Sequence, residues 1–250
     1  MYEPRYYRNP LNSEKLASFE VCYQHTDLWI ALDRDCKTKN IEKLIFDKIK
    51  SLRALLDKYC SQHDEIITSF SPLDIAKYND APAEIKQILE DCINPNVGPL
   101  ACIAGLFAQK IGKFLLTKTS ANNIIVENGG DLFVSASKPT TIKIDAGNSA
   151  FSDKIGLVIP ENLGAVGVCC SSGKRGHSTS LGKADAVVIV CKSAPLADAY
   201  ATSFCNRIKS QKDLQSIIDE IQQIPEIISA VLICEDQLAV AGSLELTKLT

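Results

Sequence analysis

The hydrophobic pattern near the start of the chain alternates and then changes to a helical period. Apolar residues stand at every second position over 19–23 and again over 28–32, which predicts two half-buried strands in succession. From 40 to 60 the apolar positions recur at spacings of three and four, which predicts an amphipathic helix. A short helix is expected after Pro82. A third helix begins at Pro99, where the missing N–H of proline does no harm.

The rest of the chain predicts mainly strands. The strand-like apolar segments are 123–127, 131–135, 141–145, 155–159, 166–170, 186–191, 230–234 and 237–241. Helical patterns cover 196–208 and 212–221. Because consecutive strands outnumber strand–helix–strand units, we predict an α+β fold with largely antiparallel sheets flanked by helices. We expect residues 1–250 to form a single domain, with a candidate subdomain junction near 69–82, where the periodicity is weak.

The helix that begins at Pro99 is rich in small residues. Ala104, Gly105, Ala108 and Gly112 fall on adjoining faces of it. Glycine in a helix costs about 1 kcal/mol relative to alanine. We therefore expect another backbone or a ligand to approach this helix closely.

Composition narrows the class of protein. The chain has 250 residues, of which 46% are hydrophobic, enough to bury a sizeable core. Its sequence contains neither an apolar run of the roughly 18–20 residues that span a bilayer nor a secretory signal. The ten cysteines include no C-x-x-C pair. We therefore expect a cytoplasmic protein that has reduced thiols, no disulfides, no zinc site and no membrane partner.

Charge is distributed unevenly along the chain. Residues 96–210 carry 12 Lys/Arg against 7 Asp/Glu, whereas the segments on either side are both acidic and the whole chain has a net charge of −3. A basic middle in an acidic protein favours a small anionic ligand such as a phosphate ester over nucleic acid, which usually requires a basic face over a whole domain. The alternative is that these cations only solvate one surface.

The segment 169–185, CCSSGKRGHSTSLGKAD, is the richest in chemistry. It combines three glycines, five hydroxyl side chains and several cations, the features of a loop that cradles phosphate. It is not a Walker loop, because five residues instead of four separate Gly176 from Gly182, and Ala184 stands where Ser or Thr is required. The alternative interpretation is a mobile, solvated loop.

A second constellation lies on the predicted helix 196–208. Asp198, Thr202 and Asn206 follow at intervals of four residues and so share one helix face. Their oxygen atoms suit a hard cation such as Mg²⁺. The alternative is a polar stripe facing solvent, which the surrounding alanines disfavour.

Two weaker signals remain. Glu127 and Asp131 flank the glycine turn 129–130, which is compatible with a ligand site or with a plain hairpin tip. Adjacent Cys169 and Cys170 near His177 raise the alternative of a thiolate nucleophile, although such cysteines at the end of an apolar strand are more often part of the core.

Taken in order along the chain, these segments resemble the ApbE-like superfamily, whose characterised members are FAD:protein FMN transferases. The similarity is greatest to a cytosolic branch of about this length. The matching stretches are His25–Ile30, Asn96–Ala101, Glu127–Asp131, Ser171–Gly173, Gly176–Ser178, Gly182–Ala186 and Leu196–Thr202.

The resemblance implies roles for particular residues. Asp198 and Thr202 would hold Mg²⁺ beside the FAD pyrophosphate, His177 would act as general base, and Asp185 would lie near the phosphates or the metal. The residues that would bind the flavin nucleotide are Gly129, Gly130, Asp131, Ser171, Ser172, Gly173, Gly176, Ser178 and Lys183.

The resemblance also implies a function. We expect a protein that binds FAD, FMN or a related small-molecule nucleotide, with Mg²⁺-dependent FMN transfer to an acceptor protein as the candidate activity. The sequence departs from the transferases before the first packed helix, where 96–100 replaces their lysine–glycine stretch, and in a longer spacing between His177 and Asp185. A non-catalytic flavin or nucleotide carrier is therefore the alternative, with a cysteine-dependent hydrolase or redox protein as a more distant one.

Overall fold

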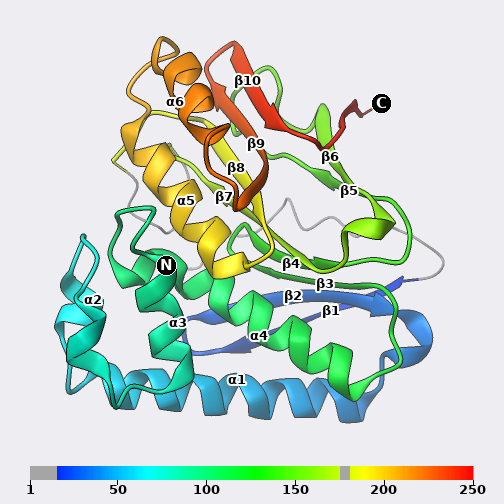
Figure 1. Ribbon diagram of the computed structural model, residues 1–250. Helices are drawn as coiled ribbons and strands as arrows, with labels where there is room; N and C mark the ends of the chain where they lie inside the picture. The colour runs from blue at the N-terminus through cyan, green and yellow to red at the C-terminus, as the bar shows by residue number, and fades with distance from the viewer. Residues whose placement is uncertain (1–15, 175–180, 250) are drawn as a thin grey trace.

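Two antiparallel sheets organise the protein, which the computed structural model describes over residues 16–174 and 181–249 (Figure 1). The larger has eight strands in the order β1-β2-β3-β4-β7-β8-β9-β10, and the smaller has three in the order β11-β6-β5. The strands of the larger sheet are β1 (Leu16–Tyr23), β2 (Thr26–Asp33), β3 (Ile124–Asn128), β4 (Asp131–Ser135), β7 (Val166–Ser171), β8 (Ala186–Cys191), β9 (Ile227–Cys234) and β10 (Gln237–Gly242). Those of the smaller sheet are β5 (Thr140–Lys143), β6 (Ile155–Ile159) and β11 (Leu246–Lys248).

Helices cover one face of the large sheet. The α-helices are α1 (Lys39–Cys60), α2 (Glu65–Thr68), α3 (Ala83–Asp91), α4 (Ile103–Lys118), α5 (Ala194–Arg207) and α6 (Asp213–Ile221). Short 3₁₀ turns are η1 (Arg34–Cys36), η2 (Ile75–Tyr78), η3 (Pro99–Cys102) and η4 (Glu161–Leu163). Helix α4 packs on β3 and β4, α5 on β7 and β8, and α6 on β9 and β10, so the helix layer follows the sheet from one edge to the other (Figure 1).

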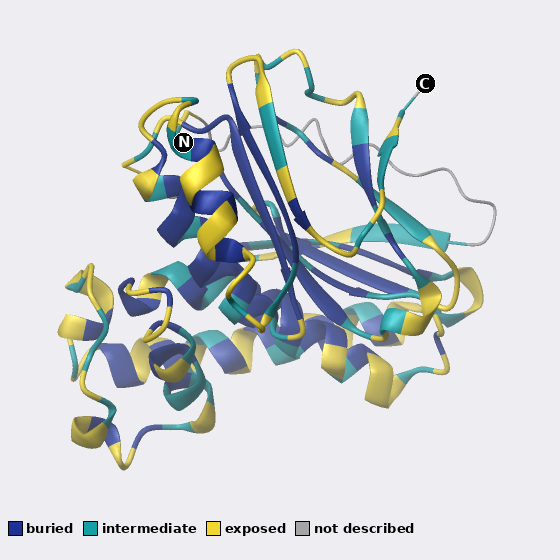
Figure 2. Ribbon diagram, turned by 45° about the horizontal axis from the view of Figure 1, so that its top comes forward, coloured by how far each residue is buried: buried dark blue, intermediate teal, exposed yellow. Residues whose placement is uncertain are grey.

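The small sheet covers the opposite face, which explains the composition of the central strands. Every residue of β8 is buried. Its residues Val187 and Ile189 belong to the core under α5 and α6, whereas Val188 and Val190 belong to the core under the small sheet. When both faces of a strand are covered, its sequence is a continuous apolar run and does not alternate between apolar and polar residues. The buried strands stand out in the centre of Figure 2.

Helix α4 is the central helix of the layer. The stretch Pro99–Lys118, which joins η3 to α4, is the one helical segment of the described residues that is long and apolar enough to cross a membrane. It packs against α1, α5, β3 and β4, and buried side chains such as Leu106, Phe107 and Ile111 belong to the main core. Its hydrophobicity is therefore accounted for by packing within the protein.

The predicted elements are found with small shifts of their ends. The antiparallel α+β fold is confirmed, and the strands and helices expected from the apolar pattern are all present. The helix expected from Pro99 starts as the 3₁₀ turn η3 and becomes α-helical at Ile103. Strand β11 and the small sheet as a separate unit were not anticipated, because register between distant strands leaves no local signature. The subdomain junction near 69–82 stays a prediction.

Glycine allows the closest approach between layers. A Cβ added to Gly167 in β7 would lie 2.2 Å from the Cα of Ala194, and one added to Gly105 in α4 would lie 2.5 Å from the carbonyl oxygen of Ala194. Both contacts are with backbone, which cannot turn aside as a side chain can. The first turn of α5 is thus fitted between β7 and α4 through two glycines, as the small residues of α4 led us to expect.

Gly167→Ala should therefore lower the free energy of unfolding by about 3 kcal/mol, since overpacked sites typically cost ~1–3 kcal/mol. Gly129→Ala is the matched control. Its added methyl would meet nothing within 4 Å, and only its positive φ of 69° is unfavourable, at about 1 kcal/mol. Urea unfolding of both variants measures the difference. Equal destabilisation would show that the α5 contact is not a tight constraint.

Candidate functional site

The site is organised by the start of α5. Pro195 stands in its first turn, where proline is favoured, and the Ala194 N–H donates to Oε1 of buried Gln109 at 3.0 Å. Gln109 belongs to α4, so a side chain of α4 accepts a hydrogen bond from a backbone N–H at the start of α5 that has no partner within its own helix. This contact fixes the direction in which the next turn of α5 presents its side chains.

Asp198, one turn further on, is buried against the start of α4. Its Oδ2 accepts a hydrogen bond from the Gly105 N–H at 2.9 Å. Burial raises the pKa of Asp198 to about 7, although hydrogen bonds from the amides of Gly105 and Ala104 act in the opposite direction. A carboxylate at a helix N-terminus is electrostatically favoured, yet here desolvation is the larger effect.

Asp131 is a second buried carboxylate in the same region. Burial and the nearby charge of Asp198 raise its pKa well above the ordinary value. Its Oδ1 is buried without a hydrogen-bond partner among the described residues. Buried polar atoms are rarely left unpaired, so this oxygen is a candidate to contact a cation or a ligand proton.

Two hydroxyl groups complete the polar cluster. Ser171 Oγ at the end of β7 lies 3.2 Å from Thr202 Oγ1 on α5, so the Asp198–Thr202 face of the helix is turned towards the protein and not towards solvent. Among the described residues, no group of three or more His, Cys, Asp or Glu side chains is arranged to hold a metal ion. A cation here would rely on Asp131, Asp198, the hydroxyls and oxygen atoms from a ligand.

The glycine turn lies beside this cluster. Gly129 and Gly130 have φ values of 69° and 103°, the left-handed conformations that a two-residue hairpin turn requires. Glu127 Oε1 accepts from the Gly130 N–H at 2.7 Å, and Asn128 Nδ2 donates to the Ala104 carbonyl at 3.2 Å. The turn is therefore anchored to the start of α4, where Asp198 also binds.

The described ends of the predicted phosphate loop are brought together by close packing. A Cβ on Gly173 would lie 2.2 Å from the Gly182 carbonyl oxygen, and one on Gly182 would lie 1.6 Å from the Cys205 carbonyl oxygen at the end of α5. Lys183 is exposed, and its N–H donates to the Ile208 carbonyl at 2.7 Å. These glycines thus serve chain packing, and a phosphate-binding role for the loop stays a prediction.

Three predicted site residues, Gly176, His177 and Ser178, lie outside the described residues. Ser172, just before this gap, accepts a hydrogen bond from the Lys174 N–H at 3.2 Å. On the other side, the Leu181 N–H donates to Asn206 Oδ1 at 2.7 Å. Asn206, the third polar residue of the predicted stripe, therefore holds one end of the loop on α5.

Asp185 is bound by a lysine side chain and by a backbone amide. Its carboxylate is 5% exposed and binds Lys174 Nζ at 2.9 and 3.0 Å. It also accepts from the Glu235 N–H at 2.6 Å in the β9–β10 turn. The catalytic role predicted for Asp185 is untested, and these contacts give it a second role as the anchor between the loop and that turn.

The cysteines at the end of β7 are poor nucleophiles. Burial raises the pKa of Cys170 to about 12 and that of Cys169 well above its usual value, with nearby Asp131 adding to both. The thiolate is the reactive form of cysteine. The surroundings of both thiols therefore disfavour the thiolate that the hydrolase alternative requires.

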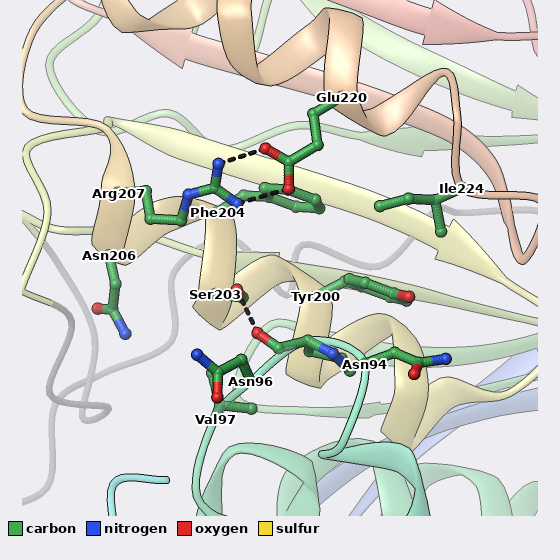
Figure 3. Close-up of a pocket in the computed structure, with 11 residues that line it drawn as sticks. Asn94, Asn96, Val97, Tyr200, Ser203, Phe204, Asn206, Arg207, Glu220 and Ile224 are labelled. Atoms are coloured by element: carbon green, nitrogen blue, oxygen red, sulfur yellow. Dashed lines mark hydrogen bonds and ion pairs between the residues drawn. The ribbon is translucent and has the colours of Figure 1, made fainter. Parts of the chain in front are cut away.

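A hollow of about 430 Å³ opens on another face of α5 (Figure 3). Its walls come from the segment after α3, from α5 and from α6. Arg207 and Glu220 form a two-fold ion pair on one side, with Nη1 and Oε1 2.7 Å apart. Ser203 Oγ donates to the Pro95 carbonyl at 2.6 Å on the other. The lining residues are Asn94, Pro95, Asn96, Val97, Tyr200, Ser203, Phe204, Asn206, Arg207, Glu220 and Ile224.

Comparison with known proteins places the chain in a family. Residues 8–239 match the family model described as "AbpE bacteria". The chain belongs to this family. A UPF0280 protein of Methanocaldococcus jannaschii is 31% identical over 234 residues, covering 91% of this chain and 92% of the relative. A UPF0280 protein of Methanococcus vannielii is 37% identical over 194 residues, covering 77% of this chain and 76% of the relative.

Solved structures of flavin transferases share the fold of this AbpE-family chain. The apo form of the flavinyl transferase ApbE from Pseudomonas stutzeri matches with a TM-score of 0.55 over 94% of each chain, at 15% identity. The flavin transferase ApbE from Vibrio cholerae matches with a TM-score of 0.54 over 91% of this chain and 97% of the other, at 10% identity. The ApbE-like fold inferred from the motifs is confirmed.

Sequence reasoning missed several residues of the site in this family member. Gln109 and Ser203 bind backbone groups of distant segments, and Arg207 and Glu220 meet across two helices, so no spacing along the chain connects them. Asn96 offered a signal in its Asn-Val-Gly-Pro turn, where it takes a positive φ of 58°. Its contribution to a hollow with α5 became visible only in the fold.

The raised pKa of Asp198 predicts a pH-dependent stability. An unfolded aspartate has a pKa of about 4, so between pH 4 and pH 7 the unfolded chain releases this proton while the folded protein keeps it. The contribution of Asp198 to the free energy of unfolding is therefore greatest below pH 4. It decreases as the pH rises and is lost once the pH exceeds the pKa of Asp198 in the folded protein. The fall between pH 5 and pH 8 should be on the order of 2–3 kcal/mol.

Asp198→Asn should reduce this fall, because the amide does not ionise. The free energy of unfolding is measured by urea titration at pH 5 and pH 8, with chelator present to keep cations away. Asp219→Asn, which removes an exposed carboxylate of α6, should retain the fall of the unmodified chain. An identical pH dependence in all three proteins would exclude the buried Asp198 as its source.

Proposed function

We propose that this protein binds a flavin nucleotide, FAD or FMN, and uses Mg²⁺ to transfer the FMN part of FAD to an acceptor protein. The proposal draws on the fold shared with proteins named flavin transferases and on the polar cluster at the start of α5. A cytoplasmic location, without a membrane or nucleic-acid partner, belongs to the same proposal.

The unpaired oxygen of Asp131 beside Asp198 is the observation that carries the proposal. Two buried carboxylates raise each other's proton affinity, and a divalent cation between them would relieve both the repulsion and the desolvation. Every donor in the cluster is an oxygen atom, from Asp131, Asp198, Ser171 and Thr202, which fits a hard cation such as Mg²⁺. When bound, Mg²⁺ supplies charge neutralisation for a pyrophosphate.

The chain's own residues would orient the nucleotide. Asp198 is held by the Gly105 N–H, so its position does not depend on the ligand. The turn at Gly129 leaves open space where a side chain would otherwise stand, which lets a ligand approach the backbone. His177, assigned by the resemblance, would take the proton from the acceptor hydroxyl as general base.

The hollow on α5 suits the heterocyclic part of such a ligand. Its volume of about 430 Å³ lies within the range of roughly 300–1,000 Å³ typical of small-molecule sites. The side-chain amides of Asn94 and Asn96 carry both donors and acceptors for a polar ring edge. Phe204 and Tyr200 provide the apolar wall (Figure 3).

A flavin carrier without transferase activity is the second candidate. It is favoured by the contacts of Asp185, whose carboxylate is occupied by Lys174 and the Glu235 amide. If Asp185 serves only to anchor these segments, it is not available for the reaction to which the resemblance assigns it. Flavin binding would then remain without transfer.

Thermal melting with FAD, FMN, ADP and Mg²⁺ separates flavin binding from other functions. We expect FAD to raise Tm, more strongly when Mg²⁺ is present, because a ligand that binds only the folded state stabilises it. At a free concentration of about 100 Kd the stabilisation is ~2.7 kcal/mol, or roughly 5–10 °C for a chain of this size. A Tm unchanged by every flavin and adenine nucleotide would overturn both candidates.

Asp198→Asn and Thr202→Val should remove the additional shift that Mg²⁺ gives to the FAD-bound protein, because each loses a proposed oxygen ligand. Asp219→Asn on α6 is the matched control and should keep it. If the Mg²⁺-dependent shift survives in both site variants, the cation lies elsewhere.

Release of AMP from FAD in the presence of Mg²⁺ and an acceptor distinguishes the transferase from the carrier. His177→Ala should reduce the rate by about 10²–10⁴-fold, the range expected for a general base, while leaving the FAD-induced Tm shift in place. An unchanged rate would refute the role of His177. A Tm shift without AMP release in the unmodified protein would support the carrier.

A further inference from the structure

Two buried cysteines face each other at the two ends of a segment that lines the hollow. The Sγ atoms of Cys92 and Cys102 are 2.8 Å apart, and the two residues are 1% and 0% exposed. All ten cysteines of the chain are thiols in the structure. The sulfurs already point at one another, so only a small movement separates them from the bond length of about 2.05 Å in a disulfide.

This arrangement differs from that of other buried thiols in the protein. Cys169 Sγ donates to the Ala194 carbonyl at 3.3 Å, and Cys234 Sγ donates to the Lys183 carbonyl at 3.8 Å. Cys92 and Cys102 also donate to backbone carbonyls, those of Gly98 at 3.4 Å and Ile88 at 3.8 Å, but each has the sulfur of the other as its nearest partner, at 2.8 Å. A sulfur–sulfur contact is the geometry from which a disulfide can form.

The pair closes a segment that forms one wall of the hollow. Cys92 follows the last turn of α3, and Cys102 ends η3 at the start of α4. Residues 94–97 between them line the hollow on α5. At present non-covalent contacts hold the segment, among them the hydrogen bond from Ser203 Oγ to the Pro95 carbonyl at 2.6 Å and a longer one from Cys92 Sγ to the Gly98 carbonyl at 3.4 Å. A covalent bond would fix both of its ends.

We propose that Cys92 and Cys102 form a modification site, a dithiol that a peroxide converts into an intramolecular disulfide bracing the wall of the hollow. One sulfur attacks a peroxide oxygen, which gives a sulfenic acid and releases the first water when hydrogen peroxide is the oxidant. The second sulfur then attacks the sulfenic sulfur, forms the S–S bond and releases the second water. The two thiols lose two electrons and two protons, and the peroxide is reduced.

Burial makes this reaction slow and its product persistent. Burial raises the pKa of Cys102 well above its usual value, with the neighbouring Cys92 adding to the shift, so little reactive thiolate is present. Exposed Cys22 and the half-buried Cys36 and Cys170 would consume oxidant first. A background carrying Cys22→Ser, Cys36→Ser and Cys170→Ser removes that competition.

The test treats this folded background protein with hydrogen peroxide, alkylates the remaining thiols under denaturing conditions, and maps linked peptides by mass spectrometry. We expect one dominant product, lighter by two hydrogen atoms, that links the peptides of Cys92 and Cys102 and separates on reduction. Closing a loop of about this length should raise Tm by roughly 5–10 °C. Amide hydrogens at 94–97 should exchange more slowly with solvent.

Cys92→Ala and Cys102→Ala should each abolish the product and the Tm rise, and Cys92→Ser serves as a second variant if the alanine variant does not fold. Cys60→Ala, which removes a buried thiol of α1, should retain both effects. The proposal is overturned if Cys92 and Cys102 are recovered alkylated after prolonged oxidation. It is also overturned if their linked peptide forms no more often in the folded protein than in urea, where pairing among the thiols is random.

Discussion

The contact of the first turn of α5 with both β7 and α4 is the constraint on which the rest of the site depends. Gly167 and Gly105 allow it, since a methyl group at either position would overlap the backbone at Ala194. Gln109 then satisfies the Ala194 N–H. With the helix fixed at this end, Asp198 reaches the Gly105 amide and Thr202 reaches Ser171, so one packing contact aligns carboxylate, hydroxyl and helix terminus.

The electrostatics of the site follow from that packing. A helix N-terminus favours a negative charge, yet burial raises the pKa of Asp198 to about 7. The protein thus holds two buried carboxylates close together, and Asp131 Oδ1 has no hydrogen-bond partner among the described residues. Such a cluster is unfavourable when both carboxylates are charged, so its contribution to stability depends on pH.

The same helix also presents a different face to the hollow. Ser203, Arg207 and Asn206 contact a loop, a second helix and the described end of the loop after β7. Helix α5 therefore contributes side chains to both the polar cluster and the hollow. A rigid helix fixes the positions of such side chains more precisely than a loop does. The Cys92–Cys102 segment forms the opposite wall, so its covalent state would act on the hollow.

The sequence by itself determined the helices other than α2, the strands other than β11, the antiparallel class of the fold and the family resemblance. Apolar spacing defines local structure directly, and the order of short motifs such as Glu127–Asp131 and Leu196–Thr202 carries information that no single motif has. It also identified Asp198 and Thr202 as polar residues in packed surroundings. These features depend on residues that are close to one another in the sequence, so they can be recognised from the sequence alone.

Only the tertiary structure decided what each residue contacts. Gly173 and Gly182, read from the sequence as parts of a phosphate loop, pack against each other and against the end of α5. Asp185 binds Lys174 and the Glu235 amide, and Cys92 meets Cys102 across ten residues of chain. Such pairings arise when sheet register and helix packing bring distant segments together. Contacts between distant segments produce no regular spacing of residues in the sequence, so the sequence does not reveal them.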